Sequence, residues 1–218
     1  MKFINLYLFL ISIPLLSNSQ STERYAYPYK NPSLPVEQRI SDLISRMTLV
    51  EKIRQLDMYR GSEIADIDEY SHQSALSTTK MEKVIQSAGI GSVRNLYPTS
   101  PVLTNEIQKF AITRTRLGIP ILMIEEGLHG YNAKGATNFP VPIAMASSWD
   151  TSLVFHIGQA IATEARSNGV HMLLFPVLGL ARDPRWGRVQ ETYGEDPFLV
   201  SSNAIAMVKG LQGDSLAN

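Results

Sequence analysis

The spacing of apolar residues predicts two consecutive helices near the start of the chain. Between Val36 and Leu56, apolar residues recur at the intervals of one helix face. Thr48 and Glu51 divide this stretch, because a T-x-x-E pair forms a capping box where a new helix begins. The apolar residues of the two faces are Ile40, Leu43, Ile44, Met47, Leu49, Ile53 and Leu56. Both helices precede any strand, so we expect them to cover one end of the sheet that follows.

Farther along, apolar runs alternate with amphipathic segments. Four runs are predicted as strands: Ile90–Leu96, Ile119–Ile124, Val141–Ala146 and Val170–Val177. Three segments are predicted as helices: Thr104–Leu117, Thr151–Asn168 and Pro197 to about Leu211. Asp150 and Asp196 are placed to cap the second and third of these helices. This order indicates a parallel sheet flanked by helices, so the predicted fold class is α/β.

Two stretches show no regular period. Residues 20–35 contain several prolines and are predicted to form an extended lead-in without a helix or strand. Arg60–Lys80 is acidic and rich in serine, and we predict a loop there that ends in a short helix, Thr78–Ser87. Loops of this length inside a compact domain are uncommon, and most of them are functional or mobile.

The number of strands limits the architecture. A closed (β/α) barrel needs eight strands and about 250 residues, whereas residues 36–218 supply about four βα units after the two helices. The sheet is therefore either open or the first half of an incomplete (β/α)8 TIM-like barrel. The last strand would offer an open apolar edge, so we expect residues 20–218 alone to be insoluble or loosely packed.

The first residues have the pattern of a secretion signal. Lys2 precedes the apolar run Phe3–Leu16, and the small residues Ser17 to Ser19 follow it. The run is too short to span a bilayer comfortably, so we predict a cleaved signal peptide over residues 1–19. A retained membrane anchor is the alternative. The mature protein is expected to be exported to the periplasm or the medium, without membrane attachment after cleavage.

Composition excludes several kinds of site and partner. Basic and acidic residues are balanced at 20 each, so no electrostatic feature favours nucleic acid. The absence of cysteine excludes disulfides, thiolate nucleophiles and zinc–thiolate sites. The sequence also lacks the HExxH, phosphate-loop, GxGxxG and GxSxG motifs. We expect no metal or cofactor, and no pattern specifies an oligomeric state.

A charged and aromatic segment, Arg182–Pro197, follows the last predicted strand. It combines three arginines and four carboxylates with Trp186 and Tyr193. Guanidinium and carboxylate groups hydrogen-bond hydroxyls, and an aromatic face covers the apolar side of a sugar ring, so a neutral polyol ligand would suit this segment. The alternative is an ion-pair network that only supports the loop. Arg94–Asn95 and Glu125–Glu126 also follow strands, so all three clusters could face one ligand.

The adjacent carboxylates Glu125 and Glu126 suggest glycoside hydrolysis, which uses an acid and a nucleophile or base. In strand geometry the two side chains point to opposite faces, so only one would reach the ligand. A binding role for one and a structural ion pair for the other is the favoured alternative. His129 could donate a proton, although capping the loop or binding sugar suits it better.

Several short motifs together resemble the N-terminal catalytic domain of glycoside hydrolase family 3, which includes β-glucosidases and β-xylosidases. They are Met47–Leu56, Leu128–Tyr131, Phe139–Pro140, Ala146–Asp150, Arg182–Pro197 and Gly210–Gly213. The resemblance extends from about Thr48 to Gly213. It implies a (β/α) barrel, a retaining mechanism with an aspartate nucleophile, and exo-action on the non-reducing ends of glycans or glycosides.

The resemblance also implies roles for individual residues. Arg188 matches an arginine that binds sugar hydroxyls, and Glu126 stands where the family often has a sugar-binding aspartate, one methylene shorter. His129, Trp186 and Glu191 are further candidates for substrate binding. The family's Lys-His pair and Ser-Asp-Trp-like nucleophile motif do not occur here. The nucleophile and the acid/base are therefore expected beyond Asn218, and this chain alone is predicted to be inactive; the alternative is a catalytically inactive sugar-binding remnant.

Overall fold

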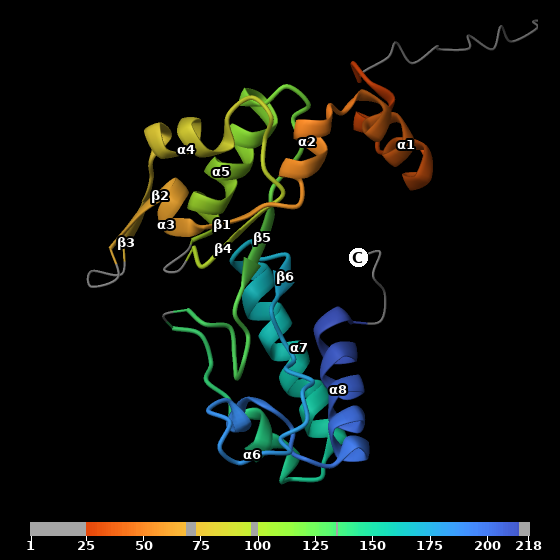
Figure 1. Ribbon diagram of the computed structural model, residues 1–218, viewed down its shortest axis with the longest axis vertical. Helices are drawn as coiled ribbons and strands as arrows, with labels where there is room; N and C mark the ends of the chain where they lie inside the picture. Colours follow the sequence, from red (N-terminus) through yellow and green to blue (C-terminus); the bar gives the residue numbers. More distant parts are fainter. Residues whose placement is uncertain (1–24, 69–72, 97–99, 134, 214–218) are drawn as a thin grey trace, which may run out of the picture. The chain divides into compact units, whose positions relative to one another are not determined.

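The computed structural model describes residues 25–68, 73–96, 100–133 and 135–213. The predicted signal peptide and the first part of the predicted lead-in lie outside these residues. The chain divides into two compact units, Met1–Arg46 and Met47–Asn218. Each unit is described by itself, and the elements are labelled in Figure 1.

The described part of the first unit, residues 25–46, contains a short helix followed by a longer one. The 3-10 helix η1, Pro28–Lys30, lies in the predicted lead-in, which is therefore not wholly extended. Helix α1, Val36–Arg46, begins at the predicted residue. Asp42 of α1 accepts a hydrogen bond from the backbone N–H of Tyr29 at 3.1 Å. This contact holds the short helix against α1.

Helix α2, Leu49–Arg54, opens with the predicted capping box. The N–H of Glu51 donates to Thr48 Oγ1 at 3.2 Å, and the N–H of Thr48 donates to Glu51 Oε2 at 2.8 Å. The apolar face predicted for this helix is not buried, since 73% of Leu49 and 54% of Ile53 is exposed. The helix instead buries Glu51, which pairs with Arg116 at 2.7 Å. The Arg116 guanidinium lowers the pKa of Glu51 to about 2.

Four parallel strands form the main sheet, in the order β1-β4-β5-β6. The strands are β1 Met58–Arg60, β4 Ser92–Arg94, β5 Leu122–Glu125 and β6 Met172–Leu173. The last three coincide with or overlap predicted strands, which confirms the α/β fold class. Strand β1 was missed, because three residues are too short to show a periodic pattern.

The strand predicted at Val141–Ala146 is wrong. This segment forms helix α6, Pro142–Ala146. Pro142 stands in the first turn, where a helix needs no N–H donor and the fixed φ of proline is favourable. The apolar run that suggested a strand instead buries Met145 against the helices of the unit. The prediction failed because a buried apolar run of this length is compatible with a strand or with a short helix.

The predicted loop Arg60–Lys80 contains regular structure. The elements are α3 Gly61–Ile64, β2 Ala65–Asp68 and β3 Gln73–Leu76, and the two strands form an antiparallel pair. Helix α4, Thr78–Ile85, confirms the short helix predicted at the end of this stretch. Ile64 is fully buried and joins the core beside the main sheet, which explains why the segment is ordered.

Three longer helices follow, each with a side-chain cap. They are α5 Pro101–Arg114, α7 Thr151–Ser167 and α8 Pro197–Gln212. The predicted caps are confirmed: Asp150 accepts from Leu153 N–H at 2.9 Å, and Asp196 accepts from Leu199 N–H at 2.7 Å. Asn168 is the C-cap of α7, and Gly169 follows it with a φ of +80°, in the left-handed region that glycine tolerates.

The two faces of the main sheet differ in their surroundings. Val93 and Met123 lie on one face and pack in a core with residues of α4 and α5. The other face, called here the open face, carries Met58, Leu122 and Met172, which are 46%, 41% and 45% exposed. Within the ranges described above, the sheet does not close into a barrel.

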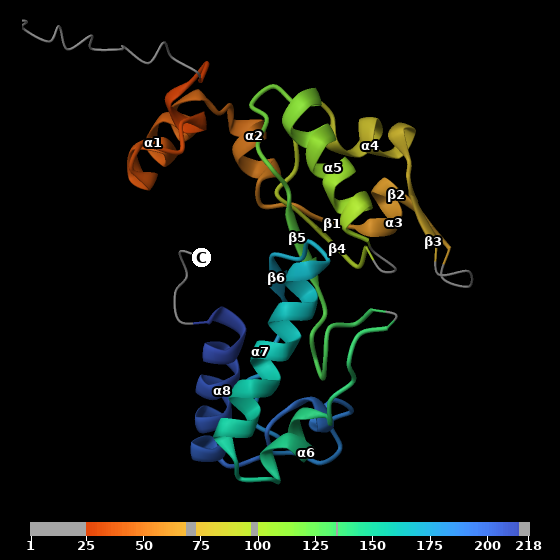
Figure 2. The same cartoon turned by 180° about the vertical axis from the view of Figure 1, so that it is seen from behind.

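Helices α7 and α8 lie side by side in both ribbon views (Figures 1 and 2), and two glycines permit their close approach. A Cβ at Gly210 would lie 2.3 Å from the carbonyl oxygen of Phe155 and 3.0 Å from the Cα of Gly158. These atoms belong to backbone, so they cannot move aside cheaply. The crossing therefore depends on the absence of a side chain at this position.

We expect Gly210→Ala to lower the free energy of unfolding by about 2 kcal/mol, because overpacking outweighs the better helix propensity of alanine. Urea unfolding of the complete gene product would measure the change. Gly187→Ala is the control, since a Cβ there meets no atom within 4 Å. Equal unfolding midpoints for the two variants would contradict the tight crossing.

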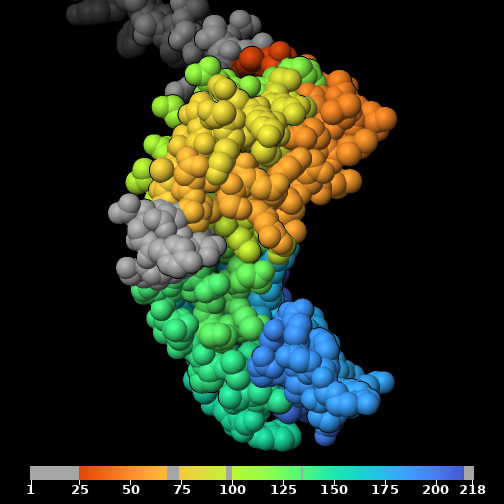
Figure 3. All heavy atoms as spheres, turned by 60° about the vertical axis from the view of Figure 1, so that its left-hand side comes forward, coloured from red at the N-terminus to blue at the C-terminus, as the bar shows by residue number. Residues whose placement is uncertain are grey.

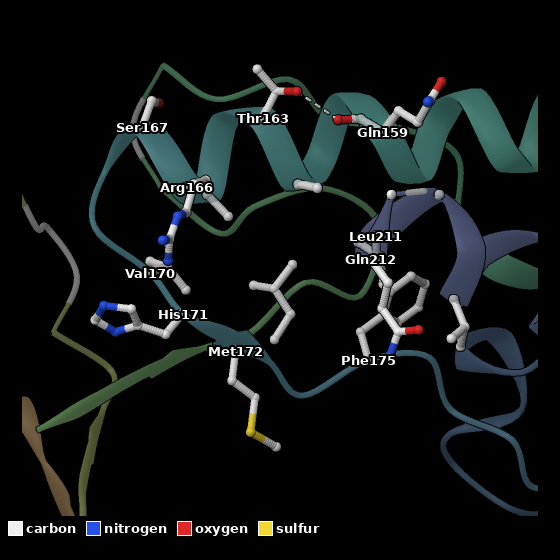
Figure 4. Close-up of a pocket in the computed structure, with 16 residues that line it drawn as sticks. Gln159, Thr163, Arg166, Ser167, Val170, His171, Met172, Phe175, Leu211 and Gln212 are labelled. Carbon is white, nitrogen blue, oxygen red and sulfur yellow. Dashed lines mark hydrogen bonds between the residues drawn. The ribbon is translucent and has the colours of Figure 1, made fainter. Parts of the chain in front are cut away.

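A groove of about 950 Å³ lies beside β6 (Figure 4). Its walls include Gln159, Thr163 and Arg166 of α7, with Leu211 and Gln212 at the end of α8. His171 also lines it, and its Nδ1 accepts a hydrogen bond from the N–H of Met123 at 3.0 Å. Burial and the nearby charge of Arg166 lower the pKa of His171. The sugar-binding candidates Glu126 and Arg188 are not among the residues that line this groove.

Candidate functional site

The adjacent carboxylates at the end of β5 point to opposite faces of the sheet, as strand geometry requires. Glu125 is only 4% exposed and lies on the same face as Met123. Glu126 follows on the open face, where its side chain is 39% exposed and its Oε1 is 3.9 Å from Arg94 Nη1. Glu126 is therefore the carboxylate that a ligand on the open face could reach.

The buried carboxyl of Glu125 is a weaker acid than an exposed glutamic acid side chain. Its Oε1 accepts a hydrogen bond from the backbone N–H of Leu96 at 2.6 Å. Burial raises the pKa of Glu125 to about 7, and the negative charge of Glu126 adds to this effect. The N–H groups of Leu96 and Asn95 act in the opposite direction. Near neutral pH, Glu125 is thus present in both protonation states.

The segment between β6 and α8 is anchored at its far end. Tyr193 is fully buried in the core formed with α6, α7 and α8. Thr192 pairs with Val177 in a parallel bridge, and Ala181 N–H donates to the carbonyl of Gly194 at 3.0 Å. Both ribbon views show this segment beside α6 (Figures 1 and 2). The charged residues of the segment are therefore held on a fixed backbone.

Arg188 and Glu191 form an ion pair within this segment. Arg188 Nε donates to Glu191 Oε2 at 2.7 Å, and 60% of the arginine side chain remains exposed. Glu191 raises the pKa of Arg188, and the charge of Glu126 raises it further. Glu126 therefore lies close enough to act on Arg188. Of the five predicted binding residues, Arg188 and Glu191 are thus in direct contact, whereas Glu126 contacts Arg94 and acts on Arg188 only through its charge.

Trp186 and His129 are not part of the charged interactions that involve Glu126, Arg188 and Glu191. Trp186 is 41% exposed, and its ring lies 3.7 Å from where a Cβ on Gly179 would be. His129 is tied through its backbone, since its carbonyl accepts a hydrogen bond from Phe139 N–H at 2.7 Å. For the part of the chain described, no contact joins the His129 ring to the other candidates. Both residues remain predictions as ligand-binding groups.

Arg60 is a site-facing cation that sequence reasoning missed. The register of β1 and β4 places Arg60 directly beside Arg94 on the open face. Like charges at neighbouring positions repel each other, so an acidic or polar group between them is favourable. Recognising β1 would have placed Arg60 there. The only signal was the short run Met58–Tyr59 after the second helix.

The exposed guanidinium and carboxylate groups form a hydrogen-bonding surface. Across the described ranges, no three His, Asp or Glu side chains are grouped so that they could hold a metal ion. The space-filling view shows the segment after β5, in green, next to the segment after β6, in blue (Figure 3). A surface built from both segments can donate and accept hydrogen bonds to a polyhydroxylated ligand.

The chain was compared with known proteins. Residues 48–218 match the family model of the glycosyl hydrolase family 3 N-terminal domain. A putative β-xylosidase of Formosa agariphila is 34% identical over 98% of this chain and 29% of its own length. A periplasmic β-glucosidase of Salmonella typhimurium is 31% identical over 82% of this chain and 21% of its own length.

A solved structure shows the same fold. A β-glucosidase of Listeria innocua, crystallised with glucose, superimposes with a TM-score of 0.68 at 35% identity. The match covers 82% of this chain and 24% of that protein. The chain therefore spans between a fifth and a third of the length of these relatives. The family match covers most of the chain, and the chain belongs to glycosyl hydrolase family 3.

Proposed function

We propose that this chain forms one wall of the sugar-binding site of an exo-acting, retaining glycoside hydrolase of the β-glucosidase or β-xylosidase type. The observation that carries the proposal is the exposed Arg188–Glu191 ion pair, whose arginine also feels the charge of Glu126, inside a domain of this family. Arg188 donates to sugar hydroxyls, and Glu126 accepts from them. Trp186 and His129 complete the same wall.

The wall binds the sugar, and other groups cleave the bond. Glu125 is buried behind the sheet, Glu126 faces Arg94, and Glu191 is paired with Arg188. A glycosidase needs two carboxyl groups that flank the scissile bond, one as the acid and the other as the nucleophile or base, and these three glutamates are not arranged in that way. We therefore assign the nucleophile and the acid/base to residues beyond Asn218.

We further propose that the protein acts outside the cytoplasm. The predicted signal peptide at residues 1–19 supports this location, as does the relative from Salmonella typhimurium, whose name describes it as periplasmic. Over the residues that the structure covers, no helix is long and apolar enough to cross a bilayer. The substrates would be glycosides or short glycans met outside the cell.

The test begins with the gene. The nucleotide sequence beyond the Asn218 codon should continue through a Lys-His pair and a Ser-Asp-Trp-like motif. The complete gene product should then release nitrophenol from an aryl β-glucoside or β-xyloside, and the first sugar released should keep its anomeric configuration. A stop codon after Asn218, or turnover with inversion, would contradict the proposal.

A sugar-binding remnant is the second candidate. It is favoured by the pairing of both carboxylates near the open face, Glu126 and Glu191, with an arginine. Saturable binding of glucose or xylose without turnover by the complete gene product would support this function. Calorimetric titration measures the binding directly.

A further inference from the structure

The carboxyl of Glu125 connects two segments of the site. Its hydrogen bond reaches from the end of β5 to the backbone of Leu96, just after β4. Arg94 is the last residue of β4 and the partner of Glu126. Glu125 therefore contacts the turn that follows Arg94, one member of the Arg94–Glu126 pair. The other member, Glu126, is the next residue along the chain after β5.

The same turn is constrained from a second side. A Cβ at Gly61 would lie 2.5 Å from the carbonyl oxygen of Asn95 and 2.7 Å from the Cα of Leu96. Asn95 itself has a φ of +55°, a left-handed conformation that asparagine tolerates better than most residues. The turn after Arg94 is thus held between the backbone of Gly61 and the carboxyl of Glu125.

We propose that Glu125 is a positioning residue, whose hydrogen bond to the Leu96 N–H fixes the turn after β4 and so holds Arg94 beside Glu126 for sugar binding. This inference rests on the proposed function of the open face. It assigns Glu125 no contact with the sugar and no part in bond cleavage. It differs from a general stabilising role in its expected effect, which is a change in substrate binding through the Arg94–Glu126 pair.

The variants separate the hydrogen bond from the charge. Glu125→Gln keeps an oxygen acceptor for Leu96, whereas Glu125→Met has similar length and no acceptor. Gly61→Ala displaces the same turn from its other side. Gln108→Met is the control, because the Gln108 side chain also hydrogen-bonds to backbone, at 2.6 and 2.9 Å to Ile121, just before the other end of β5.

In the complete gene product, Glu125→Met and Gly61→Ala should raise KM for the aryl glycoside roughly tenfold and change kcat less than threefold, since binding common to ground and transition states appears in KM. Glu125→Gln should stay within about threefold of wild type in both constants, because its oxygen still pairs with the Leu96 N–H. Gln108→Met should leave KM unchanged. An equal rise of KM in the control, or none in Glu125→Met, would overturn the proposal.

Two further readouts do not require turnover. Deuterium uptake at residues 92–96 should increase in Glu125→Met and Gly61→Ala but not in Gln108→Met. The groups that affect the charge of Glu125 are the Glu126 carboxylate, the buried hydroxyl of Tyr131 and the N–H groups of Asn95 and Leu96. Unchanged uptake in both turn variants would refute the positioning role even if no glycoside is hydrolysed, whereas increased uptake without hydrolysis would refute only the proposed function.

The pH dependence of stability checks that Glu125 titrates in place. Its pKa is about 7 in the folded protein, against 4.5 for an unperturbed glutamic acid side chain. The raised value means that its contribution to stability is fully present below pH 4.5 and is lost as the pH rises through 7. The melting temperature of wild type should therefore fall more between about pH 5 and pH 8 than that of Glu125→Gln. Parallel curves would show that the carboxyl is not buried as described.

Discussion

Replacing Arg188 by methionine is expected to reduce kcat/KM of the complete gene product about 10²- to 10³-fold. The guanidinium supplies charged donors to sugar hydroxyls, and each such hydrogen bond is worth roughly tenfold to a hundredfold. The replacement also leaves Glu191, whose side chain is only 15% exposed, without its cation. Initial rates with an aryl β-glucoside and an aryl β-xyloside would measure the loss.

Arg185 provides the matched control in the same segment. It is paired with Asp183, and 88% of its side chain is exposed. Arg185→Met should change kcat/KM less than about twofold, because exposed ion pairs contribute little. A similar loss of kcat/KM in both variants would mean that the positive charge of the segment matters and that the position of Arg188 does not. A small loss in Arg188→Met would remove Arg188 from the sugar site.

Local signals explain which parts of the fold could be predicted from sequence. The caps at Thr48, Asp150 and Asp196 depend on residues within one helical turn, and all three occur as expected. Strand β1 and the β2–β3 pair depend on partners elsewhere in the chain. Runs of three or four residues do not encode such partners, so these strands were missed. The error at Val141–Ala146 arose because apolar content was taken as strand although a proline stood at the start of a helix.

In the candidate site, too, local features could be predicted from the sequence and non-local contacts could not. Arg188 and Glu191 are three positions apart, and their pairing can be expected from the segment alone. The opposite orientation of Glu125 and Glu126 follows from strand geometry. In contrast, the bond between Glu125 and Leu96 spans 29 positions, and the neighbouring placement of Arg60 and Arg94 requires the register of two strands. Non-local contacts of this kind became visible only in three dimensions.

The 218-residue chain by itself is expected to hydrolyse no aryl glycoside. The carboxylates closest to the open face are engaged, Glu126 near Arg94 and Glu191 with Arg188. Glu125 is buried on the opposite face, where no sugar can reach it. Glycosidases need two carboxyl groups on opposite sides of the scissile bond, and these three glutamates do not form such a pair.

The exposed open face gives a second reason to expect that the isolated chain is inactive. Met58, Leu122 and Met172 present apolar surface there, which favours self-association of the isolated chain over a defined pocket. Purified residues 20–218 should therefore release nitrophenol no faster than buffer, and light scattering should detect aggregates. If turnover were found and abolished by Glu191→Ala or Glu125→Ala, that carboxylate would be the nucleophile. The cleavage chemistry would then lie within this chain, and the division between a binding wall and a separate catalytic part would be wrong.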